Sequence, residues 1–221
     1  MRFLKPMRMM ALSTVLLVVM TIVATISSGL VHAASLVTVS GNPSPYTGCS
    51  TAGQPGTVSV NAEVEPWVSV NPANPKNIIG VWQQDRWNNG GAQGLVAGSS
   101  SNGGTTWSES TLPFSGCAPG AILDPFTGTP YNRASDPWVS IGPDGTAYTV
   151  GLLATNSTIS GNNDTGVATV TSSDGGKTWG NGRLIKSDQG TSPIFEVSHF
   201  FNDKESITAD PLHAGTAYVV W

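Results

Sequence analysis

The stretch Ser100–Trp107 reads SSNGGTTW, and it recurs as SSDGGKTW over Ser172–Trp179, an offset of 72 residues. Each copy places two glycines after a short amide or carboxylate. This combination turns the chain tightly, because glycine tolerates positive φ and Asn or Asp accepts hydrogen bonds from the amides that follow. The final tryptophan is typical of an apolar anchor at the start of a strand.

We therefore interpret both copies as β-hairpin turns, in which the acid at Asp174 has a structural role rather than a catalytic one. The tryptophans are expected to pack inside their own units of structure. The residues that define the two turns are Ser100, Asn102, Gly104, Trp107, Ser172, Asp174, Gly176 and Trp179.

Two further elements recur with nearly the same period. Glu65–Val70 (EPWVSV) matches Asp136–Ile141 (DPWVSI), and a weaker copy follows at Glu205–Asp210 (ESITAD). Gly145–Val150 (GTAYTV) returns as Gly215–Val220 (GTAYVV). Three elements in one phase indicate a structural unit of about 70 residues that is repeated in tandem.

One period contains four candidate strands, at about 66–70, 77–83, 93–100 and 105–111. The chain has 26 glycines, 15 prolines and only 11% charged residues, with no long run of apolar residues at helical spacing. Short apolar runs between turn residues favour an all-β fold. A four-stranded antiparallel unit repeated in tandem is typical of a β-propeller blade.

The repeat divides the chain into an export segment at 1–33, an N-terminal extension at 34–62, and blades at 63–133, 134–202 and 203–221. These are about two and a half blades, whereas a ring needs roughly four to eight. The sequence therefore predicts an incomplete propeller from a longer protein. Expressed alone, it is expected to be inactive and to self-associate through its uncovered edges.

Residues 1–33 have the features of a signal peptide. A basic start precedes the apolar run Ala11–Ile26, and Val31–Ala33 offers the small residues that signal peptidase accepts. The alternative is a retained membrane anchor, but the run is shorter than the ~20 residues that span a bilayer. We expect a secreted protein with no membrane association after cleavage. The basic residues are Arg2, Lys5 and Arg8.

The charge of the remaining chain excludes some partners. The export segment carries three of the ten basic residues and none of the 14 acidic ones, which leaves seven against 14, a formal charge of −7. Nucleic acid and anionic membranes are therefore not expected partners. Cys49 and Cys117 would meet an oxidising compartment, as a disulfide or as two buried thiols. No Cys or His spacing is typical of a zinc site, and we predict no metal and no cofactor.

The two turns fit Ser-x-Asp-x-Gly-x-Thr-Trp, the Asp box of the bacterial neuraminidase repeat, with Asn102 replacing Asp in the first copy. With two boxes in phase with a blade repeat, residues 63–221 resemble the sialidase superfamily. The resemblance implies a secreted glycoside hydrolase of exo-α-sialidase type with a glycan or glycoconjugate ligand. The alternative is a non-catalytic surface propeller that binds carbohydrate or protein.

Family members hold the sialic acid carboxylate with three arginines, donate a proton from an aspartate, and attack through a tyrosine assisted by a glutamate. The first arginine lies in an Arg-Ile-Pro run, where this chain has Val64-Glu65-Pro66 and so lacks it. Arg86 matches the second arginine. The expected aspartate is absent from Trp87–Gly91. No catalytic residue is therefore assigned.

The first strand of each blade lines the central channel of a propeller. Glu65, Asp136 and Glu205 share one repeat position, so we expect them to surround one mouth of that channel, near Arg86 and Arg133. These five candidate substrate-binding residues would suit a polyhydroxylated or cationic ligand, or a metal. Alternatively, the acids cap strand ends or pair with the two arginines as structural ions.

Overall fold

The computed structural model of the chain describes four ranges of residues: 36–49, 54–155, 164–189 and 201–221. The predicted signal peptide lies outside them. The chain divides into two units, Met1–Leu36 and Val37–Trp221, and the architecture below is that of the second. In the part of the chain that the structure describes, no helix is long and apolar enough to cross a membrane.

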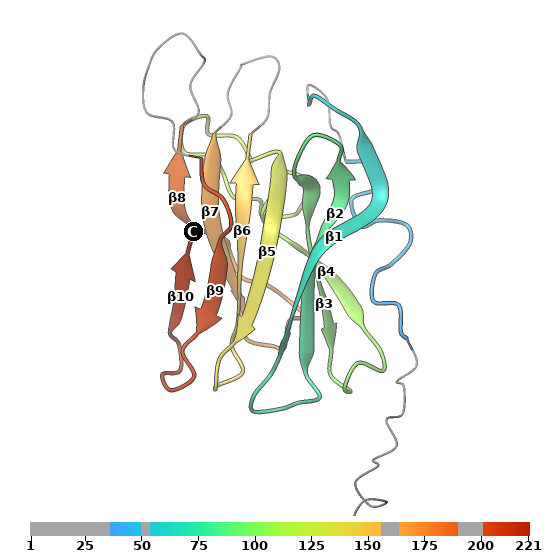
Figure 1. Cartoon of the computed structure of the whole chain (residues 1–221), viewed down its shortest axis with the longest axis vertical. Coiled ribbons are helices and arrows are strands. Elements are labelled where there is room, and N and C mark those ends of the chain that lie inside the picture. Colours follow the sequence, from blue (N-terminus) through green and yellow to red (C-terminus); the bar gives the residue numbers. More distant parts are fainter. Residues whose placement is uncertain (1–35, 50–53, 156–163, 190–200) are drawn as a thin grey trace, which may run out of the picture. The chain divides into compact units, whose positions relative to one another are not determined.

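The first blade is a four-stranded antiparallel sheet in chain order (Figure 1). Each strand pairs with the next along the sequence. Its strands are β1 (Val58–Val70), β2 (Ile78–Trp87), β3 (Ala92–Ser100) and β4 (Ser108–Leu112).

The second blade repeats this arrangement, and the pair β9 (Ser206–Ala209) and β10 (Ala217–Val220) follows it. A single residue pair, Ala92 with Ala134, links the sheets of the two blades. The prediction of an all-β fold built from four-stranded antiparallel blades is therefore confirmed. The strands of the second blade are β5 (Arg133–Ile141), β6 (Ala147–Ala154), β7 (Thr165–Ser172) and β8 (Arg183–Asp188).

The largest apolar core lies between the two blades. Alternate residues of the strands face it, because successive side chains of a strand point to opposite sides of a sheet. Each fully buried Val, Leu or Ile contributes roughly 1.5 to 3 kcal/mol, which holds one blade against the next. The core includes Ile79, Val81, Leu95, Leu112 and Phe114 from the first blade, and Val139, Leu153, Ala168 and Val170 from the second.

The two eight-residue repeats form matching turns. In the second, Asp174 Oδ1 accepts hydrogen bonds from the amides of Lys177 and Thr178, both at 3.0 Å, and Oδ2 accepts one from the Thr178 hydroxyl at 2.6 Å. In the first, Asn102 Oδ1 accepts the Thr106 amide at 3.0 Å. These bonds account for a short amide or carboxylate at this position.

The glycines and serines of the two turns also match. The amides of Gly104 and Gly176 donate to the hydroxyls of Ser100 and Ser172, both at 2.9 Å. The two glycines have φ angles of 85° and 89°, a region that other residues rarely adopt.

The tryptophans differ in their environments. Trp179 packs against the core between the blades and donates to Ser110 of the first blade at 3.1 Å. It therefore joins two blades, whereas the sequence placed it inside its own. Trp107 donates to the Gly104 carbonyl at 3.0 Å and lines an apolar hollow with Trp82.

Asp174 should make the stability of the protein depend on acidity. Burial opposes its ionisation, but the hydrogen bonds from Thr178, Ser172 and Lys177 outweigh it and lower the pKa of Asp174 to about 2. A folded pKa below the unfolded value of about 4 gives stability that is present above pH 4 and lost as the pH falls towards 2.

We expect Asp174→Asn to remove part of this acid dependence, by less than about 1 kcal/mol because the side chain is exposed and solvent screens it. The reciprocal variant Asn102→Asp should add a similar dependence to the first turn. Urea unfolding at pH 6 and pH 2.5 measures both, and equal acid dependence in the three proteins would contradict the prediction.

A disulfide and side-chain hydrogen bonds link the N-terminal segment, residues 36–49, to the first blade. Cys49 and Cys117 form a disulfide with a Cα–Cα distance of 5.6 Å. The buried Tyr46 hydroxyl donates to the Leu95 carbonyl at 2.6 Å, and Ser44 donates to the buried carboxylate of Asp85 at 2.6 Å. This segment covers part of the free face of the blade, where Tyr46 packs with Trp82, Val96 and Ala118.

The first strand begins at Val58, within the stretch that the sequence assigned to an N-terminal extension. Its first half carries polar residues on both sides, and Asn61 has a φ of 59°, which interrupts the pairing with β2. The alternation that marks a strand is therefore weak before residue 63.

Candidate functional site

Two acidic residues interrupt the first strands of the two blades in the same way. Glu65 in β1 and Asp136 in β5 have φ angles of 53° and 49°, and a proline follows each. The pairing of both strands shifts register here, as in a β-bulge. Positive φ is costly for residues other than glycine, and such conformations concentrate at functional sites.

The third copy of this element is aligned by its pairing. Ala209 of β9 faces Ala217 of β10, as Ile141 of β5 faces Ala147 of β6. This register places Lys204 at the position of the two acids, and Lys204 also has a positive φ, of 58°. The predicted alignment of Glu205 with Glu65 and Asp136 is therefore wrong by one residue.

Glu205 instead takes the place of the buried Pro137 and is only 3% exposed. Neither of its carboxyl oxygens has a hydrogen-bond partner among the described residues. Burial, with a smaller contribution from the charge of Asp136, raises the pKa of Glu205 to about 8. Burial of this carboxyl therefore favours its neutral form.

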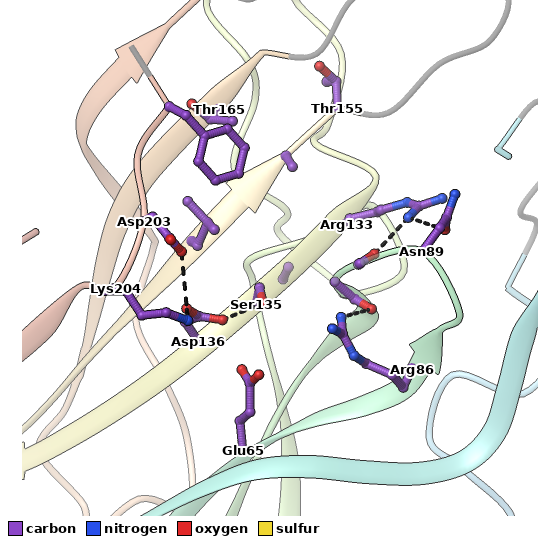
Figure 2. A pocket seen from close by; sticks show the side chains of 16 residues that line it. Glu65, Arg86, Asn89, Arg133, Ser135, Asp136, Thr155, Thr165, Asp203 and Lys204 are labelled. Carbon is purple, nitrogen blue, oxygen red and sulfur yellow. Dashed lines mark hydrogen bonds and ion pairs between the residues drawn. The ribbon is translucent and has the colours of Figure 1, made fainter. Parts of the chain in front are cut away.

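A pocket of about 350 Å³ lies at this point, where the first strands of successive units come together (Figure 2). It carries charges of both signs beside an exposed aromatic ring. We call it the inner-strand pocket; its lining includes Glu65, Arg86, Ser135, Asp136, Phe201 and Lys204.

A hydrogen-bond network connects the two acids. The buried amide of Gln83 donates to the Glu65 carboxylate and to the Ser135 hydroxyl, the latter at 3.0 Å. Ser135 donates to Asp136 Oδ1 at 2.6 Å, and the Lys204 ammonium donates to Asp136 Oδ2 at 3.1 Å. Figure 2 shows the Glu65 carboxylate pointing towards Asp136.

The environments of the two acids move their pKa values apart. Burial, together with the hydrogen bond to Asp136 and the charge of that residue, raises the pKa of Glu65. Burial also opposes ionisation of Asp136, but hydrogen bonds from Ser135, Glu65 and Lys204 outweigh it and lower its pKa. Of the two carboxyls, Glu65 is therefore the weaker acid and holds a proton to higher pH than Asp136.

The two candidate arginines have different roles. Arg133 is 2% exposed and donates to the Asn89 side chain at 2.9 Å, to the Gly90 carbonyl at 2.7 Å and to the Pro55 carbonyl, while it stacks over Trp87. Its guanidinium points towards Asn89 and away from Asp136 (Figure 2). It therefore holds the structure together.

Burial, and then the charge of Arg86, lowers the pKa of Arg133 to about 10, so it stays charged at neutral pH. Arg86 itself is half-buried and makes a single hydrogen bond to the described residues, from Nη1 to the Gly91 carbonyl at 2.6 Å. No described residue accepts a hydrogen bond from its other guanidinium nitrogens, which leaves them available to a ligand.

In the described ranges, no group of three or more His, Cys, Asp or Glu side chains is arranged to hold a metal ion.

No family model and no curated protein matches the chain. Several solved structures do. The Hadza microbial sialidase Hz136 matches at 20% identity and a TM-score of 0.42, over 56% of this chain and 26% of its own. The Trypanosoma rangeli sialidase in complex with sialic acid matches at 14% identity and 0.37, over 70% and 25%.

The Penicillium chrysogenum α-L-arabinanase complexed with arabinobiose matches at 19% identity and 0.40, over 70% of this chain and 42% of its own. The chain is similar in fold to sialidases. It spans less than half the length of each of these proteins, and similarity at this level concerns the fold alone.

Three residues of the site were missed by the sequence reasoning: Gln83, Ser135 and Lys204. Gln83 and Ser135 look like ordinary polar residues of strands, and only the pairing of blades shows that they meet. The GTAY repeat does not identify Lys204, because its offset of 70 residues places Ser206 opposite Asp136, and only the pairing of β9 with β10 shows that the preceding strand is offset by 68.

Proposed function

We propose that the inner-strand pocket binds carbohydrate, and that the protein is a glycoside hydrolase of exo-α-sialidase type. The observation that carries the proposal is the hydrogen-bond network that links Glu65 to Asp136, in a pocket that Arg86 also lines. Sugar hydroxyls need several donors and acceptors close together, and the pocket offers both. A secreted protein would meet such ligands as glycoconjugates.

In this proposal, Glu65 is the proton donor to the leaving oxygen of the glycosidic bond. Asp136 keeps it protonated, and Ser135 and Lys204 hold Asp136 in place. Arg86 would bind the carboxylate of a sialic acid. As the glycosidic C–O bond breaks, the leaving oxygen takes the proton of Glu65, and a water molecule forms the new bond to the anomeric carbon and releases its own proton to solvent.

A second candidate function is non-catalytic binding of carbohydrate. Arg133 favours it, because its donors are already committed to the protein and a clamp of several arginines on one anionic sugar needs them free. In that case the pocket would bind a sugar through Arg86 and the carboxyl pair without cleaving it.

Binding and hydrolysis test the two functions separately. We expect the 221-residue chain to bind 3′-sialyllactose with a Kd below about 1 mM in isothermal titration calorimetry. Hydrolysis is assayed with a fluorogenic sialoside on the protein purified from its native host. Binding with hydrolysis supports the enzyme, and binding alone supports the non-catalytic propeller. Absence of binding at 10 mM sugar, an order of magnitude above that Kd, would contradict both.

A further inference from the structure

We infer that a second sugar-binding position adjoins the inner-strand pocket, where the next sugar unit of the ligand packs on the stacked indoles of Trp67 and Trp138. This inference rests on the proposed function and extends it, since it names the residues that would hold the sugar unit next to the one in the inner-strand pocket.

The two indoles form a stack that crosses from one blade to the next. Trp67 of β1 and Trp138 of β5 each lie two residues after an acid of the pair, and their ring centroids are 3.4 Å apart with an angle of 23° between the planes. Trp138 packs against the apolar core beside β9. Trp67 is 39% exposed, so part of its indole is accessible to a ligand.

The first strand of the third unit, β9, leaves a space beside the two stacked indoles. In the register of β9, the residue at the position of Trp138 is Ser206, since Lys204 takes the position of Asp136. The first two blades carry a tryptophan at this position, and the small side chain of Ser206 leaves the corresponding space open. A pocket of about 420 Å³ lies there. Its lining includes Trp67, Trp138 and Ser206.

The chemistry of this space matches a sugar unit. An indole face packs well against the C–H face of a pyranose, which is apolar, while the hydroxyls at its edge need hydrogen-bond partners. Glu65, Asp136 and Lys204 line this space and the inner-strand pocket alike, so the two are contiguous. One oligosaccharide can therefore occupy both.

The test compares a monosaccharide with an oligosaccharide that contains it. We expect the 221-residue chain to bind 3′-sialyllactose about tenfold more tightly than N-acetylneuraminic acid, from the added packing on the indole. Trp67→Ala should reduce this ratio to about twofold and leave the Kd of the monosaccharide unchanged. Trp67→Phe should keep most of the ratio, and Trp107→Ala, outside both pockets, should keep all of it.

A second variant fills the space beside Ser206 and leaves the indole of Trp67 in place. Ser206→Trp would fill the position beside Trp138 and should lower the ratio as Trp67→Ala does, without the loss of an indole. If both variants keep the ratio of the two Kd values unchanged, the second sugar-binding position is overturned, while the proposed function stays intact. Trp67-dependent competition by tetramethylammonium would show a cation site and also overturn it. Failure of the unmodified chain to bind either sugar would overturn both proposals.

Discussion

Replacing Arg133 by leucine should lower the free energy of unfolding by about 2 to 3 kcal/mol, because several hydrogen bonds from a buried guanidinium are lost together. Its guanidinium satisfies the carbonyls of Gly90 and Pro55 and the side chain of Asn89 at one point. Leucine fills part of the volume but leaves these partly buried acceptors without their donor. Urea unfolding followed by tryptophan fluorescence measures the loss.

Arg86→Leu is the matched control for this measurement. Arg86 is half-buried and makes one hydrogen bond, so its loss should cost no more than about 1 kcal/mol. Equal losses in the two variants would show that Arg133 is not the structural arginine that its contacts indicate.

Replacing Glu65 by glutamine should lower kcat for glycoside hydrolysis by about 10²- to 10⁴-fold, the usual contribution of a general acid. Glutamine keeps the shape of the side chain but has no proton of suitable acidity to donate. The assay uses the protein purified from its native host, with a fluorogenic sialoside. Glu63→Gln is the control, because Glu63 lies on the same strand and outside the pocket; an equal effect would contradict the assignment.

The pH profile gives a second readout for the same residue. A proton donor must be protonated, so the rate should fall as the pH rises through the raised pKa of Glu65. Asp136→Asn removes a charge that raises this pKa, and the fall should therefore move to lower pH. A profile that stays in place after this change would show that Glu65 is not the group that titrates.

The fold could be predicted from the sequence because the same elements recur at a spacing of about 70 residues. The hairpin turns carry their own signal, since Asp174, Gly176 and the residues around them are the types that such a turn requires. The start of β1 could not be predicted, because Asn61 interrupts the alternation of side chains on which strand prediction depends.

The candidate site was predicted only in part. The repeat brought Glu65 and Asp136 to one position, and the structure places them in one network. In the third copy, the sequence comparison aligned Glu205 with these two acids because all three are acidic. The strand pairing instead places Lys204 at that position. The role of Arg133 depends on contacts with residues far away in the sequence, which no local pattern contains.

The most direct test of a carbohydrate site in the inner-strand pocket is an NMR titration of the isotope-labelled chain with 3′-sialyllactose. We predict that the largest chemical-shift changes occur at Glu65, Arg86, Asp136 and Lys204, which line the pocket from three successive units. Changes concentrated at the hairpin turns around Asn102 and Asp174, or no changes at all, would contradict the account.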